Sequence, residues 1–122
     1  MASIKRVGFS PAQNNTADLF KALGHPARIA ILELISNDRL PCKHVEIQLE
    51  LSKSTISRHM QILFDAGIIG YNKILNETYY FVNPLALTSA ADYLAEPIIK
   101  NENQNFENVH FKIPEGITNP KL

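Results

Sequence analysis

Two of the helices expected in this sequence are separated by only two residues. One is expected over residues 42–50 ("CKHVEIQLE"), and the next begins at Lys53, directly after Leu51-Ser52. A connection this short makes two helices meet at a steep angle, which is the geometry of a helix-turn-helix. This pair constrains the fold more than any other feature of the chain.

Three further segments have the apolar spacing or the capping residues of helices. "TADLFKAL" (16–23) is expected to be capped at Asn15 or Thr16 and stopped by Gly24. "HPARIAILELIS" (25–36) has Pro26 near its first helical position, where the missing N–H does no harm. The last helix is expected over "LALTSAADYLA" (85–95), and Pro97 should end or kink it.

The periodicity changes after the fourth helix, which should end near Ala66-Gly67. "IIGYNKI" (68–74) and "TYYFV" (78–82) are rich in β-branched and aromatic residues, and the short link "LNE" between them is typical of a hairpin. A hairpin directly after a helix-turn-helix is a wing. The predicted fold is therefore mainly α with a small β-hairpin: a winged helix-turn-helix of five helices plus a two-stranded wing.

The expected organisation is one domain with extensions. Residues 1–14 should form an N-terminal arm, residues 15–100 the winged helix-turn-helix domain with its dimerisation helices, and residues 101–122 a C-terminal tail. A chain of 122 residues with 45% hydrophobic content can build one core of this kind.

Charge and cysteine content favour a cytoplasmic protein that holds an anionic ligand on its first half. The net charge is zero, but residues 1–60 carry eight Lys or Arg against five Asp or Glu, whereas residues 61–122 carry four against seven. Cys42 is the only cysteine, so an internal disulfide is impossible and a reducing cytoplasm is expected. No apolar run approaches the ~20 residues of a membrane helix, so we expect no membrane partner.

The fourth helix has two chemically different faces. On a wheel of 100° per residue, one side is apolar and the other carries hydroxyl, guanidinium and amide groups. The apolar side holds Ile56, Met60 and Leu63, and the polar side holds Ser54, Ser57, Arg58 and Gln61. Arg58 is suited to guanine, and Gln61 to adenine or the DNA backbone. Alone, such a face fits ordinary solvated surface equally well, but the adjoining turn and hairpin favour DNA.

Two runs of sequence resemble a known family. "LFKALGHPARIAILELI" is similar to the opening of the ArsR-type (arsenical-repressor-like) winged helix-turn-helix regulators, and "LELSKSTISRHMQILFDAGII" resembles their helix-turn-helix. The resemblance runs from about Asp18 to Pro84 and implies a dimeric repressor that leaves its operator when an effector binds. The residues here do not identify an effector.

The resemblance also implies a set of DNA-contacting positions in the fourth helix. They are Lys53, Ser54, Thr55, Ser57, Arg58 and His59. His59 has an alternative role, because the wheel places it beside the apolar face, where it could be a core-margin histidine instead.

The expected wing differs from the arginine-rich, glycine-tipped wings of that family. Its tip is Leu75-Asn76-Glu77, and Lys73 is the only basic residue of the hairpin. We therefore expect Lys73 to assist DNA binding only weakly.

A homodimer is expected because the first and last helices have more apolar surface than one small core can bury. The candidate contacts are Leu19, Leu23, Leu87, Ala91 and Leu94. Two-fold symmetry in the protein would require a pseudo-palindromic operator in double-stranded DNA.

Neither a metal site nor a catalytic site is expected. Metal-sensing relatives place Cys-x-Cys at the start of the third helix, where this chain has Pro41 and Lys43, with Cys42 out of register. Asp92 is followed by Tyr93 and Leu94, so an Asp-x-His pair on the last helix is missing too. Cys42 has no second thiol in the chain, so we expect an ordinary free cysteine and no cofactor.

The predicted function is that of a non-enzymatic, sequence-specific DNA-binding transcriptional regulator, a dimeric repressor whose fourth helix enters the major groove. The alternative is a winged-helix protein-interaction module without DNA binding. Zero net charge and the acidic residue at the wing tip favour this alternative, and the serine-arginine face opposes it.

Overall fold

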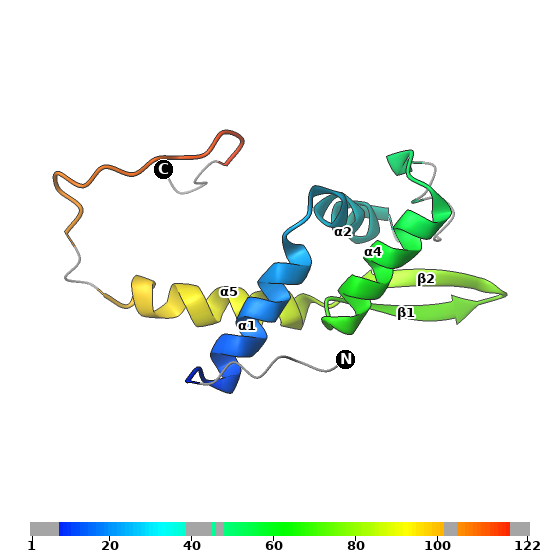
Figure 1. Ribbon diagram of the computed structural model, residues 1–122, viewed down its shortest axis with the longest axis horizontal. Coiled ribbons are helices and arrows are strands. Elements are labelled where there is room, and N and C mark those ends of the chain that lie inside the picture. Colours follow the sequence, from blue (N-terminus) through cyan, green and yellow to red (C-terminus); the bar gives the residue numbers. More distant parts are fainter. Residues whose placement is uncertain (1–7, 39–44, 46–47, 102–104, 118–122) are drawn as a thin grey trace.

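The computed structural model of the chain describes residues 8–38, 45, 48–101 and 105–117 (Figure 1). Within these residues four helices and one antiparallel hairpin are delimited. They are α1 (Pro11–Leu23), α2 (Pro26–Asp38), α4 (Lys53–Asp65), β1 (Ile69–Ile74), β2 (Glu77–Val82) and α5 (Pro84–Ile99). The expected mainly helical fold with a two-stranded hairpin is confirmed.

The count of delimited helices is four, one fewer than the five expected. Most of the segment expected to form the third helix, including Cys42 to His44, lies outside the described residues. Three of its positions, Val45, Gln48 and Leu49, are described and are helical. Val45 is fully buried, which agrees with its expected inward position.

Helix α1 begins earlier than predicted. A cap at Asn15 or Thr16 was expected, but the N-cap is Ser10 and Pro11 occupies the first turn. The Ser10 hydroxyl oxygen accepts the Gln13 N–H (3.1 Å), and the Ser10 N–H donates to Gln13 Oε1 (2.9 Å). This reciprocal capping box satisfies two backbone donors and so fixes the start of the helix. The helix therefore starts inside the range assigned to the N-terminal arm, and the remaining domain boundaries stay predictions.

Helix α4 is bounded at both ends by specific caps. The Ser52 hydroxyl oxygen accepts the Thr55 N–H (3.2 Å), so Ser52 is the N-cap. After Asp65 the chain turns through Gly67, which has a φ of +76°, and the Ile68 N–H returns to the Leu63 carbonyl (3.0 Å). A left-handed residue at this place favours glycine and stops the helix just before β1.

The wing is a regular antiparallel hairpin. Its register runs from Ile69 opposite Val82 to Ile74 opposite Glu77. Leu75 and Asn76 form the two-residue turn, and both have positive φ (49° and 69°), as a type I′ turn requires. In Figure 1 the hairpin and α5 extend in opposite directions from the region where β2 is followed by α5.

Helix α5 passes through Pro97 and ends two residues later, at Ile99. Pro97 was expected to end or kink the helix, and the helix ends about half a turn after it. Pro97 lies in the last turn, so its missing N–H removes one hydrogen bond close to the end of the helix. At the other end, the Asn83 side chain caps the helix by accepting the Leu85 N–H (3.2 Å).

The core lies where α2, α4 and the start of the wing meet. Its fully buried side chains are Ile31, Ile35, Val45, Ile56, Leu63 and Ile68. Residues 105–117 form no helix or strand and lie apart from this core in Figure 1. No helix in the described ranges is long and apolar enough to cross a bilayer.

Candidate nucleic-acid interface

The two faces predicted for α4 are present in the fold. Ile56 and Leu63 are fully buried and Met60 is 3% exposed, so the apolar face is used entirely within the chain. The opposite side of the helix exposes Lys53, Ser54, Ser57, Arg58 and Gln61. The face of α4 opposite the core is therefore polar and cationic.

Three hydroxyl groups gather at the N-terminus of α4. The Ser52 hydroxyl donates to Thr55 Oγ1 (2.8 Å) and lies 3.2 Å from Ser54 Oγ. The first turn holds no acidic residue. An uncompensated helix N-terminus with small hydroxyls and an adjacent Lys53 suits an approaching phosphate.

Arg58 and Gln61 differ in how free their side chains are. Arg58 is exposed, and the described residues offer it no carboxylate partner. Gln61 is exposed too, but its amide Nε2 donates to Asp65 Oδ1 (2.8 Å). The Arg58 side chain is thus free to bind a base edge or a phosphate. The Gln61 side chain must first break its hydrogen bond to Asp65. Both assignments stay predictions.

His59 is buried, with only 8% of its surface exposed. Its Nδ1 accepts a hydrogen bond from Arg28 Nε (3.3 Å), and its ring centroid lies 4.6 Å from that of His25. Burial, and then the nearby charges of His25, Arg28 and Arg58, lower the pKa of His59. The ring is therefore neutral at pH 7 and carries its proton on Nε2. This arrangement places His59 at the margin of the core, and a contact between its ring and DNA stays a prediction.

The Arg28 contact was not anticipated from the sequence. Arg28 comes from α2, 31 residues before His59, and its Nη1 also donates to the Ala22 carbonyl (2.7 Å). It therefore ties the end of α1 and the middle of α4 to α2. A local pattern in the sequence gives no signal for so distant a pairing.

The wing adds little positive charge to this surface. Lys73 is exposed and lies opposite Thr78 in the register, while Leu75 at the tip is 93% exposed. Tyr71 contacts both Phe64 of α4 (ring centroids 5.5 Å apart) and Tyr80 (6.4 Å). The base of the wing is thus fixed to α4 by aromatic rings.

The predicted dimer residues fall into two groups. Leu19, Leu23 and Leu87 are half-buried and pack against the core of their own chain, whereas Ala91 and Leu94 are exposed on α5. The sequence reasoning missed several larger apolar side chains that are exposed near them. These are Phe20 (41%), Leu85 (71%), Ile98 (62%) and Ile99 (76%).

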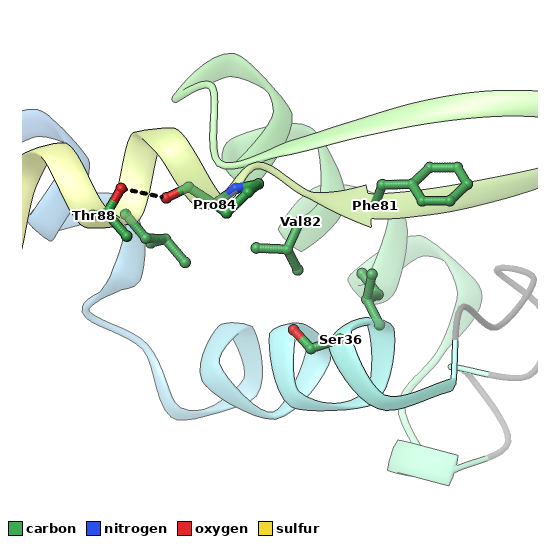
Figure 2. A pocket seen from close by; sticks show the side chains of 7 residues that line it. Ser36, Phe81, Val82, Pro84 and Thr88 are labelled. Atoms are coloured by element: carbon green, nitrogen blue, oxygen red, sulfur yellow. Dashed lines mark hydrogen bonds between the residues drawn. The ribbon is translucent and has the colours of Figure 1, made fainter.

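A separate apolar hollow of about 400 Å³ lies between α2, the end of β2 and the start of α5 (Figure 2). Figure 2 shows Val82 of β2 between α2 and α5, with Ser36 on α2 below it. The Thr88 hydroxyl donates to the Pro84 carbonyl (2.9 Å), so its hydrogen is already used. No charged side chain lines the hollow.

Among the residues that the structure describes, no group of three or more His, Cys, Asp or Glu side chains could hold a metal ion. The predictions about Pro41, Cys42 and Lys43 fall outside the described residues.

A helix-turn-helix whose reading helix exposes a polar face and has no acid in its first turn, with an adjacent wing, defines the class of winged helix-turn-helix DNA-binding proteins. Comparison with known proteins agrees. A family described as "Helix-turn-helix domain" matches residues 23–69. The chain is 28% identical over 86 residues to the transcriptional repressor SdpR of Bacillus subtilis, covering 70% of this chain and 96% of that protein.

A second relative is closer in identity. An HTH-type transcriptional regulator of Methanocaldococcus jannaschii is 35% identical over 68 residues, which cover 54% of this chain and 75% of the relative. The chain therefore belongs to the HTH-type transcriptional regulators.

Solved structures show which winged fold this is. An ArsR-like transcriptional regulator from Rhodococcus sp. RHA1 is similar with a TM-score of 0.67 and 21% identity, covering 77% of this chain and 88% of that one. A homodimeric winged helix-turn-helix DNA-binding domain from Mycobacterium bovis is similar with a TM-score of 0.59 and 18% identity, covering 87% and 99%. The fold is the ArsR-type winged helix-turn-helix, as the resemblance in sequence predicted.

Proposed function

We propose that this protein is a dimeric transcriptional repressor that places α4 in the major groove of a pseudo-palindromic operator. The observation that carries the proposal is the division of α4 into a fully buried apolar face and an exposed face of hydroxyls and Arg58. A helix face that carries hydroxyl and guanidinium groups, with no acid in the first turn of its helix, is matched to the edges of bases and to phosphates.

The proposed contacts are assigned by the position of each side chain on α4 and on the wing. Lys53, Ser54 and Thr55 lie at the N-terminus of α4 for backbone phosphates, and Ser57 and Arg58 lie one turn later for base edges. Lys73 adds a weak contact from the wing. Because an operator is reached only in the compartment that holds the DNA, the proposal also places the protein in the cytoplasm.

The dimer is supported by exposed apolar surface on α5. Leu94, Ile98 and Ile99 are all at least half exposed, and α1 contacts α5. A second copy of the chain is the partner that would bury this surface, and the two-fold axis would present two α4 helices to successive turns of the duplex. Sedimentation at micromolar concentration should show a dimer, and a stable monomer there would contradict the proposal.

Salt-dependent gel shifts test DNA binding. The DNA upstream of the protein's own gene should be retained more strongly than a random duplex of equal length, and both complexes should weaken steeply as salt rises. The alternative, a winged-helix module that binds a protein, is favoured by the zero net charge and by Glu77 beside the wing tip. It predicts no shift with either duplex at any salt concentration.

A further inference from the structure

A second hollow, of about 370 Å³, lies between the junction of α1 and α2 and the side of α4. Its walls come from residues that are distant in the sequence. They are His25, Arg28, Thr55, Arg58, His59 and Ile62. Two of these, Thr55 and Arg58, also belong to the proposed DNA-binding surface of α4. The hollow is thus continuous with the proposed interface but extends it towards α2.

The lining of this hollow is cationic and contains no acid. Arg28 and Arg58 both line it, and no Asp or Glu does. Arg28 is held in place by its bonds to the Ala22 carbonyl (2.7 Å) and to His59 Nδ1 (3.3 Å). These bonds use two of the five N–H donors of its guanidinium, and no partner among the described residues takes the other three. A fixed guanidinium with unused donors and no counter-ion is suited to an oxyanion.

The two histidines add donors of the same kind. His25 accepts the Ala27 N–H at its Nδ1 (3.0 Å), and His59 accepts from Arg28 at its Nδ1. Because Nδ1 is an acceptor in each ring, the proton of each neutral ring is on Nε2, which is then a donor. Together with the Thr55 hydroxyl, the hollow offers hydrogen-bond donors from α2, from α4 and from the connection between α1 and α2.

We propose that this hollow binds a backbone phosphate of the DNA whose major groove α4 enters. The inference rests on the proposed function, because it takes the phosphate from a duplex held by the polar face of α4. A major groove is flanked by a row of phosphates on each side, and Arg58 and Thr55 join the hollow to that face. Arg28 and His25 are thereby assigned to the DNA interface, although neither lies on the reading helix.

The test is the salt dependence of binding to a random duplex and to the upstream duplex, measured by fluorescence anisotropy. Arg28→Gln should weaken both complexes several-fold and to the same extent, since a phosphate carries no sequence information. It should also reduce the slope of log affinity against log salt by about 0.9, which is the value for one lost phosphate contact. Arg28→Lys retains the charge and should keep the slope near that of the parent.

Lys100→Gln is the matched control, because it removes the same unit charge. Lys100 caps the far end of α5 and pairs with Glu96. It should leave the slope unchanged. If Arg28→Gln behaves like Lys100→Gln while the parent binds DNA steeply with salt, the phosphate site is wrong and the proposed function stands. If the parent itself does not bind either duplex, the proposed function fails.

A measurement on the parent protein decides the matter if Arg28→Gln does not fold, as judged by circular dichroism. Inorganic phosphate, added at constant ionic strength against chloride, should shift the ring-proton NMR signals of His25 and His59 saturably and leave those of His110 in the tail in place. Adding duplex should then displace the phosphate effect. No shift, or a shift that the duplex does not displace, would overturn the assignment to a DNA phosphate.

Discussion

Helices α4 and α5 both carry apolar side chains at intervals of three and four, but they use them in opposite ways. In α4, Ile56 and Leu63 are completely buried. In α5, Ala90 is the buried residue, while Leu94 is 50% and Ile98 is 62% exposed. The apolar face of α4 is buried inside its own chain, whereas much of the apolar surface of α5 stays exposed to solvent.

The difference indicates which kind of partner each helix meets. A helix face that exposes hydroxyl, amide and cationic groups gains little from an apolar partner, so its complement is a polar anion such as DNA. A helix that exposes leucine and isoleucine gains by removing them from water, at about 25 cal/mol per Å² of apolar surface. Its complement is another apolar protein surface. The four predictions below test this contrast, in order of decreasing effect.

The largest effect, a loss of folding stability, should come from shortening a side chain on the buried face of α4. Leu63 is fully buried. Leu63→Ala removes three carbon atoms from the core and leaves a cavity, so the free energy of unfolding should fall by about 2–5 kcal/mol. Urea denaturation followed by circular dichroism measures it. Leu75→Ala, at the 93% exposed wing tip, is the matched control and should change stability by less than about 0.5 kcal/mol.

The next effect should come from charging the exposed face of α5. Leu94→Lys should leave the fold intact, since the side chain is half exposed, but should weaken dimerisation by about 2–4 kcal/mol if Leu94 lies at the centre of the interface. Sedimentation equilibrium gives the dissociation constant. Ser89→Lys introduces the same charge about 140° away around the helix and should have a much smaller effect. Equal dimerisation of both variants and the parent would remove Leu94 from the interface.

Much of this contrast could be predicted from the sequence. The spacing of Ile56, Met60 and Leu63 predicted the buried face of α4, and the change of period after Gly67 predicted the wing. These features depend on residues close together in the chain, which is why a periodic pattern finds them. The residues of the capping box of α1, Ser10 and Gln13, are also visible in the sequence, but the cap was expected at Asn15 or Thr16.

The features that were not predicted depend on distant contacts. The wheel placed His59 at the edge of the apolar face, but the pattern could not show that Arg28 reaches it from α2. It also could not show that Leu19, Leu23 and Leu87 pack inward while Ile98 and Ile99 remain exposed. Apolar spacing reveals that a face is apolar, and only the packed fold reveals which surface covers it.

The third prediction concerns the exposed face of α4. Arg58→Ala should weaken binding to the operator by about 1–3 kcal/mol if the guanidinium reads a base, and should relax the preference at one position in each half-site. Binding to a library of single-base operator variants by fluorescence anisotropy measures both. Gln61→Ala is a useful comparison on the same face, because Gln61 is already bonded to Asp65 and should contribute less. Parent-like binding by Arg58→Ala would identify the polar face as ordinary solvated surface.

The smallest effect should come from the wing, where the polar surface of α4 is extended by a single cation. Lys73 is the only basic residue of the hairpin, and the turn next to it carries Leu75, Asn76 and Glu77 instead of further cations. Because a lysine on a backbone phosphate is a point charge without base information, Lys73→Ala should weaken operator and random duplex alike, by less than about 1 kcal/mol, and flatten the salt slope by about 0.9. Glu77→Gln, one strand away, should strengthen both complexes slightly by removing a repulsion. If Lys73→Ala weakened binding to the operator alone, the wing would read sequence. The assignment of base contacts to α4 and phosphate contacts to the wing would then be wrong.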